Sequence, residues 1–201
     1  MISRDYDRFG RMIDLLELQK EFILRHLGEG GVAVDFTMGN GHDTSFLSKV
    51  VGEGGRVYAF DIQPEAIEST RKTLDADGCP DNVTLILDSH SNVKKYVSEN
   101  ISAGMFNLGF MPGGDKTKTT MRETTLPAVR DAVDMLAPGG ILSVAIYPGH
   151  AEGDAEGREL REYYGTLDRH EYCCTEIHIV NSPASPYFTI IERRLSRNGG
   201  K

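Results

Sequence analysis

The chain has 201 residues, of which 39% are hydrophobic and 26% charged, and its net charge is −8. The length predicts one domain spanning 1–201, with a helical segment at 1–31 packed on it. The acidic balance argues against a large uniform basic face for nucleic acids, although a few Lys and Arg side chains could still meet RNA phosphates. No apolar run approaches the roughly 20 residues of a membrane span, and the first residues carry acids instead of a signal-peptide core. Three cysteines, two of them adjacent, suggest no disulfide framework. We therefore expect a cytoplasmic protein without a membrane partner.

Apolar spacing predicts a helix from Phe9 to Leu27, followed by strands alternating with helices. The predicted strands are 32–35, a segment ending at 61, 83–87, 105–110 and 141–146. A last pair, 173–180 and 187–192, is joined by a Pro-rich turn. This order predicts a Rossmann-like α/β fold, in which a mostly parallel seven-stranded sheet carries helices on both faces and an antiparallel C-terminal strand.

The segment from Val32 to Thr44 carries the strongest functional signal. An apolar strand ends at Asp35, a turn contains Gly39 and Gly41, and a helix follows. Glycines let the backbone approach a ligand, and the start of a helix offers unpaired N–H groups. The next strand ends in Asp61, at the place where a βαβ unit binds the hydroxyls of a nucleoside ribose.

Two classes of cofactor use this geometry, and the turn favours one of them. A dinucleotide site needs a third glycine for the pyrophosphate, but Thr44 stands at that position. Asp35 and Asp43 would also repel a pyrophosphate. These carboxylates suit S-adenosylmethionine, which has a cationic amino-acid end and a ribose for Asp61. We favour this methyl donor over a nicotinamide or flavin.

Polar residues also end the later strands. Asp88, Ser89 and His90 follow the third strand, where an adenine edge could bind, although a local capping role for His90 is equally compatible. Asn107-Leu-Gly-Phe-Met-Pro follows the fourth strand and is similar to the Asn/Asp-Pro-Pro-aromatic motif of amino-group methyltransferases. Tyr147 and His150 border the same mouth, and His150 could relay a proton unless it is a loop residue without a role. The candidate catalytic residues are Asn107, Tyr147 and His150.

Taken together, these motifs resemble one family of class I methyltransferases, over about residues 10 to 194. It is labelled as an rRNA methylase family of Gram-positive bacteria, and its members methylate the 5-aminomethyl group of the wobble 2-thiouridine in tRNA. The resemblance implies S-adenosylmethionine as donor, tRNA bound at its anticodon region as partner, and no metal. It also implies that Asn40, Asp43 and Thr44 hold the methionine end and that Gln63 lies near the adenine and ribose. The candidate cofactor-binding residues are Asp35, Gly39, Asn40, Gly41, Asp43, Thr44, Asp61, Gln63, Asp88, Ser89 and His90.

Two other functions stay open at this point. A small-metabolite methyltransferase would suit the acidic surface, and a non-catalytic nucleoside-binding module would use the same donor turn. The polar groups at Asn107 and His150 argue against mere binding. We also expect a homodimer, because pairing two acidic chains would lengthen a surface for RNA and because two-fold dimers are the commonest oligomers.

Overall fold

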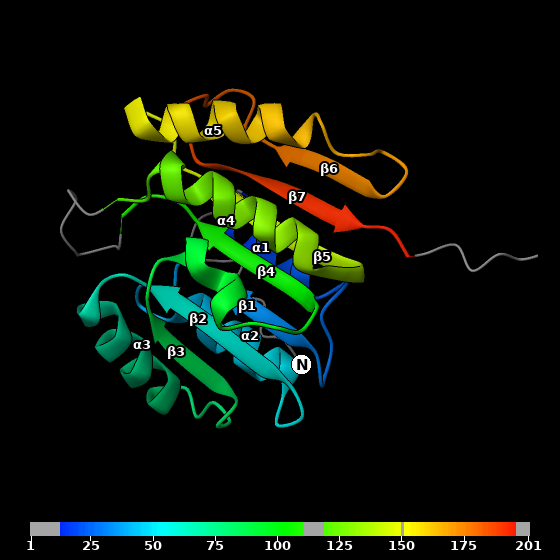
Figure 1. Cartoon of the computed structure of the whole chain (residues 1–201). Helices are drawn as coiled ribbons and strands as arrows, with labels where there is room; N and C mark the ends of the chain where they lie inside the picture. The colour runs from blue at the N-terminus through cyan, green and yellow to red at the C-terminus, as the bar shows by residue number, and fades with distance from the viewer. Residues whose placement is uncertain (1–12, 111–118, 150, 196–201) are drawn as a thin grey trace, which may run out of the picture.

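The structure is a computed structural model that describes residues 13–110, 119–149 and 151–195. Seven strands form one sheet in the order β3-β2-β1-β4-β5-β7-β6 (Figure 1). β1 to β5 pair in parallel, whereas β7 runs antiparallel to both β5 and β6. This confirms the predicted mostly parallel sheet with an antiparallel C-terminal strand. The strands are β1 Val32–Asp35, β2 Arg56–Asp61, β3 Val83–Leu87, β4 Ile101–Asn107, β5 Leu136–Ile146, β6 Tyr172–Ile177 and β7 Tyr187–Arg193.

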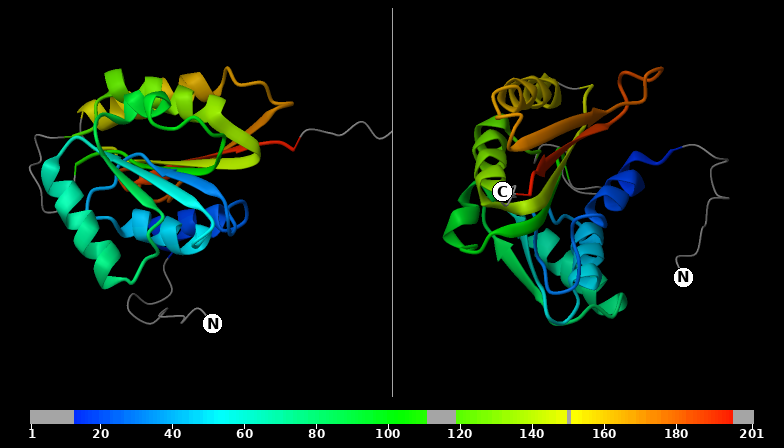
Figure 2. Two further views of the ribbon diagram at one scale, coloured as in Figure 1. Left: turned by 60° about the horizontal axis from the view of Figure 1, so that its bottom comes forward. Right: turned by 90° about the vertical axis from the view of Figure 1, so that its right-hand side faces the viewer.

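Helices cover both faces of the sheet (Figure 2). Successive side chains of a strand point to opposite faces. Val34 of β1 therefore belongs to the core cluster that includes residues of η1, α4 and α5, while its neighbour Ala33 belongs to the cluster that includes residues of α1 and α2. α3 lies beside α2. The helices are α1 Leu15–Ile23, α2 His42–Val51, α3 Pro64–Ala76, the 3-10 helix η1 His90–Lys95, α4 Arg122–Met135 and α5 Ala151–Tyr164. None of the helices in these ranges is long and apolar enough to cross a membrane.

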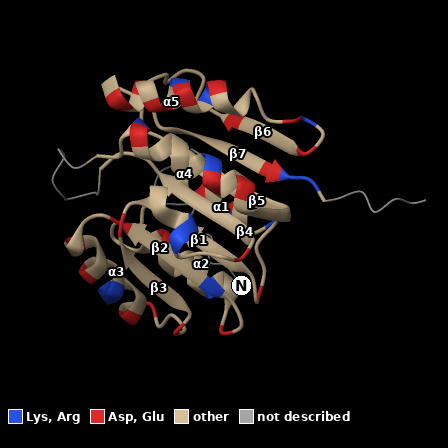
Figure 3. Cartoon of the chain, in the orientation of Figure 1, with Lys and Arg blue, Asp and Glu red and all other residues tan. Residues whose placement is uncertain are grey.

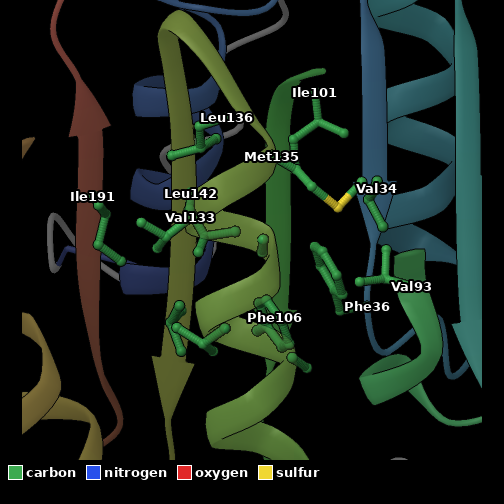
Figure 4. Packing of buried hydrophobic residues seen from close by; sticks show 14 of the residues in the cluster. Val34, Phe36, Val93, Ile101, Phe106, Val133, Met135, Leu136, Leu142 and Ile191 are labelled. Carbon is green, nitrogen blue, oxygen red and sulfur yellow. The ribbon is translucent and has the colours of Figure 1, made fainter. Parts of the chain in front are cut away.

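Stacked aromatic rings join the ends of β1 and β4 (Figure 4). The ring of Phe36 lies flat on that of Phe106, with centroids 4.0 Å apart, and both side chains are buried. Gly104 makes room for this stack, since a Cβ there would lie 3.0 Å from the Phe36 ring and 2.6 Å from Leu142. The packing fixes the two strand ends relative to each other, and these ends form the floor of the site described below.

The strand order reverses between β1 and β4, which is where open α/β sheets bind their ligands. The chain leaves β1 through a tight turn in which Gly41 has a φ of +82°. A Cβ at Gly41 would lie 2.7 Å from the Cα of Thr70 on α3. Glycine is therefore required at this position for two reasons, the left-handed backbone conformation and the close approach of α3.

Several boundaries differ from those predicted by the sequence. β4 runs from Ile101 to Asn107 instead of 105–110, because Gly109, with a φ of +126°, turns the chain away from the sheet. β5 begins at Leu136, five residues before the predicted start, and a register shift against β4 accommodates its Pro-Gly-Gly segment. β6 ends at Ile177 instead of 180. Of the predicted helix 9–27, the described part is helical from Leu15 to Ile23.

Candidate active site

A cavity of about 1020 Å³ opens at the carboxyl ends of β1 to β5. This volume is at the upper end of the range for small-molecule sites, so the cavity has room for a cofactor together with an acceptor group. Ten of the predicted site residues line it, whereas Asp35, Gly41 and Thr44 lie off its wall. His150 falls outside the described residues. The ten lining residues are Gly39, Asn40, Asp43, Asp61, Gln63, Asp88, Ser89, His90, Asn107 and Tyr147.

Asp35 and Thr44 form a buried link beneath the donor turn. The Asp35 carboxyl, 1% exposed, accepts hydrogen bonds from Thr44 Oγ1 at 2.6 Å and from the Thr37 backbone N–H at 3.0 Å. Burial, with a further contribution from the nearby Asp43, raises the pKa of Asp35 to about 7. The pair joins the end of β1 to the first turn of α2, and in this position it supports the cavity wall from behind.

Asp61 is held in place by the backbone of both neighbouring turns. Its two carboxylate oxygens accept hydrogen bonds from the N–H of Gly39 at 3.1 Å and of Gln63 at 2.9 Å. Burial raises its pKa above the usual range, and these backbone bonds oppose that effect. Asp61 also lines the cavity, and because a carboxylate is an acceptor only, the side chain suits hydroxyl groups there.

Asp88, at the end of β3, already has three donors. It accepts hydrogen bonds from Asn92 Nδ2 at 2.9 Å, Tyr96 Oη at 2.9 Å and the Ser89 N–H at 2.7 Å. The hydrogen bond from Asn92, followed by that from Tyr96, holds the pKa of Asp88 below its usual range. Asp88 therefore anchors η1 as well as lining the cavity.

His90 is a neutral, buried imidazole. Its Nδ1 lies 3.1 Å from the Phe36 carbonyl oxygen, and because a carbonyl can only accept, Nδ1 carries the proton. Burial lowers the pKa of His90 to about 4. The remaining nitrogen, Nε2, is a buried acceptor without a hydrogen-bond partner among the described residues. An unsatisfied acceptor of this kind is costly unless a ligand donates to it.

Asn107 has a fixed orientation at the end of β4. Its backbone N–H donates to Thr37 Oγ1 at 2.8 Å, and its side-chain Nδ2 donates to the Asp43 carboxylate. The amide oxygen Oδ1 is buried and has no hydrogen-bond partner within the part of the chain that the structure describes. Burial raises the pKa of Asp43, and Lys20 Nζ at 3.9 Å opposes that effect. The Asn107 side chain lines the cavity, next to Asp43.

The wall also contains residues that the sequence analysis did not single out. They include Asp14, the N-cap residue of α1, Glu17 and Lys20 of α1, and Thr119 and Thr120. The polar face of the predicted first helix was an available signal, but apolar spacing alone does not say which element lies opposite that face. Thr119 and Thr120 belong to none of the sequence motifs described above.

Carboxylates outnumber cationic side chains around the cavity. Among its described lining residues Lys20 is the one lysine or arginine, against five acids, namely Asp14, Glu17, Asp43, Asp61 and Asp88. Burial, with Asp43 nearby, raises the pKa of Tyr147 above its usual value, so this phenol stays protonated. In Figure 3, basic and acidic positions are interspersed over the helices and form no broad basic face in that view. The cavity suits a cationic ligand.

Comparison with known proteins identifies the family. The family model described as "Putative rRNA methylase" matches residues 57–193. The chain belongs to this family. One relative is the protein named "tRNA (mnm(5)s(2)U34)-methyltransferase, chloroplastic" of Arabidopsis thaliana. It is 38% identical to this chain over 176 residues, which are 83% of this chain and 64% of that protein. The chain thus spans less than two thirds of that relative.

Solved structures support the same assignment. A "putative rRNA-methylase" from Clostridium thermocellum is 38% identical with a TM-score of 0.87, covering 90% of this chain and 98% of that one. A putative methyltransferase from Streptococcus mutans, in complex with SAH, is 35% identical with a TM-score of 0.82, covering 90% and 99%. The family and the Rossmann-like methyltransferase fold predicted from the sequence are therefore confirmed.

Proposed function

We propose that the protein transfers a methyl group from S-adenosylmethionine to the amino nitrogen of 5-aminomethyl-2-thiouridine at the wobble position of tRNA, forming 5-methylaminomethyl-2-thiouridine. The observation that carries this proposal is the Asn107 amide, whose Nδ2 is held by Asp43 while its buried Oδ1 lacks a partner among the described residues. An amide oxygen oriented in this way can accept an N–H bond from a primary amine.

The cofactor predicted from the sequence is S-adenosylmethionine, and the family together with the SAH complex of the Streptococcus mutans relative bears this out. The chain's own residues fit it. The Asp61 carboxylate lines the cavity where ribose hydroxyls can donate to it, His90 Nε2 is a buried acceptor for an adenine donor, and the excess of carboxylates suits a cation. When bound, this cofactor supplies an electrophilic methyl group on a positively charged sulfur.

On the acceptor side, the chain orients an amine and favours its approach. The Asn107 Oδ1 atom would accept one N–H bond and thereby direct the nitrogen lone pair. The surrounding carboxylates attract the ammonium form, which must lose a proton before its nitrogen can act as a nucleophile. His150, predicted as a proton relay, lies outside the described residues and stays a prediction, and Tyr147 is proposed to line the amine site.

The tRNA substrate is supported by the relatives. The Arabidopsis protein, 38% identical, is named for the modified wobble uridine, and the family description names RNA. Binding at the anticodon region follows from that substrate. The structure also favours a second candidate, a methyltransferase for a small cationic metabolite, since Lys20 is the one lysine or arginine among the described residues of the cavity wall.

Methylation of tRNA in vitro separates the two candidates. tRNA from cells that lack this modification enzyme, and that therefore carries the free aminomethyl group, is incubated with the protein and S-adenosylmethionine, and its nucleosides are analysed by mass spectrometry. We expect one added methyl group, on the aminomethyl nitrogen. tRNA without the aminomethyl group is the matched control and should gain none. Methylation of a ring atom or of ribose, or no methylation of RNA, would reject the tRNA proposal.

A further inference from the structure

Glu156 is a buried carboxylate outside the cavity wall. It lies on α5, is 1% exposed, and accepts hydrogen bonds from Thr125 Oγ1 at 2.6 Å and from Thr120 Oγ1 at 3.1 Å. Burying a carboxylate is costly unless it is hydrogen-bonded, so these two threonines stabilise it. The neighbouring Gly157 allows α5 to lie close to the sheet, since a Cβ there would be 2.4 Å from Tyr187 Oη.

Thr120 extends this contact to the acceptor end of the cavity. Its Oγ1 accepts a hydrogen bond from the Gly109 N–H at 2.8 Å, and its own N–H donates to the Gly109 carbonyl at 2.9 Å. The adjacent pair, Phe110 and Thr119, forms an antiparallel bridge. Gly109 comes two residues after Asn107. Hydrogen bonds thus connect α5 to Gly109, which the chain itself joins to Asn107 at the end of β4.

The direction of these bonds depends on Glu156. A carboxylate only accepts, so the Thr120 hydroxyl hydrogen points to Glu156 and a lone pair of Oγ1 is left for the Gly109 N–H. Glu152, one turn earlier on α5, accepts from the Arg122 N–H at 2.9 Å and holds the start of α4 in the same way. By contrast, Thr125 bonds to the same carboxylate but, among the described residues, neither bonds to Gly109 nor lines the cavity.

We infer that Glu156 and Thr120 are positioning residues for the acceptor side of the cavity, an inference that rests on the proposed function. They fix Gly109, and through it the wall beside Asn107, without contacting Asp61 or Asp43 of the donor side. Loss of the Thr120 hydroxyl should therefore lower kcat/KM for the tRNA substrate and leave the affinity for the cofactor unchanged. If these hydroxyls served only the overall stability of the fold, loss of the Thr120 hydroxyl and loss of the Thr125 hydroxyl would have the same effect.

The test compares Thr120→Val with Thr125→Val, because each removes one hydroxyl from the same carboxylate while keeping the side-chain shape. Thr120→Ser, which keeps the hydroxyl, is the conservative control. Hydrogen exchange of the Gly109 amide is followed by NMR, and kcat and KM for tRNA are measured beside the affinity for S-adenosylhomocysteine. We expect Thr120→Val to raise Gly109 exchange and to lower kcat/KM for tRNA, each by about tenfold, as for the loss of one buried hydrogen bond.

Thr125→Val and Thr120→Ser should stay close to the wild type in both measurements, and all three variants should bind S-adenosylhomocysteine normally. Equal Gly109 exchange in Thr120→Val and Thr125→Val would overturn the inference, and so would equal tRNA kinetics in the two variants. If the wild type itself does not methylate tRNA, the proposed function fails on that result. The exchange measurement then decides by itself whether Thr120 positions Gly109.

Discussion

Asp61 provides the sharpest test of the donor site, through the substitution Asp61→Asn. The carboxylate oxygens accept from the Gly39 and Gln63 N–H groups, and the side chain lines the cavity, where it can meet ribose hydroxyls. The asparagine keeps the size of the side chain and one acceptor oxygen, but its NH₂ group can accept neither a backbone N–H nor a ribose hydroxyl. The charge is lost as well.

The expected loss follows from the bonds involved. A hydrogen bond to a charged acceptor contributes about 1.5–3 kcal/mol, and about 1.4 kcal/mol corresponds to a tenfold change in affinity. We therefore expect Asp61→Asn to weaken binding of S-adenosylhomocysteine by about 10- to 100-fold. Asp61→Ala, which removes both oxygens, should nearly abolish binding.

Calorimetric titration with S-adenosylhomocysteine measures this effect. Glu65→Gln is the matched control, because Glu65 is exposed on the first turn of α3, carries the same charge and does not line the cavity. Its affinity should equal that of the wild type, which separates a direct contact from a general change in charge. An Asp61→Asn protein that melts at the wild-type temperature and binds with wild-type affinity would refute the assignment of Asp61 to the cofactor.

Three further predictions concern catalysis, pH and assembly. Asn107→Ala should lower tRNA turnover far more than affinity for S-adenosylhomocysteine, and normal turnover in steady-state assays would contradict the amine-acceptor role. The pKa of Asp35 is raised to about 7 in the folded protein, so the wild type loses free energy of unfolding as the pH rises from 4 to 7. Asp35→Asn is uncharged throughout and should not lose it. In urea titrations the variant should therefore gain stability relative to the wild type over that interval, by at most about 4 kcal/mol. An unchanged difference between the two proteins would show that Asp35 is ionised normally. Light scattering should give twice the 22.2 kDa of one chain, whereas a single-chain mass would reject the proposed dimer.

Local sequence determined most of the sheet. Short apolar runs bounded by turns located β1, β2, β3 and β7. In the structure Pro64 is the first residue of α3, where its missing N–H has no helical partner to lose. Placing Asp61, Asp88 and Asn107 around one cavity was also possible from sequence, because the carboxyl ends of parallel strands meet at the same edge. These features depend on the spacing of residues along the chain, which the sequence records directly.

The tertiary structure alone decided what each polar group does. Asp35 and Asp43 look equivalent in the sequence, but packing buries Asp35 against Thr44 behind the wall and leaves Asp43 on the wall with Asn107. In the same way, Glu156 and Thr120 are 36 positions apart and meet only because α5 packs beside α4. Contacts of this kind depend on how helices and strands pack in three dimensions, and no local pattern specifies them.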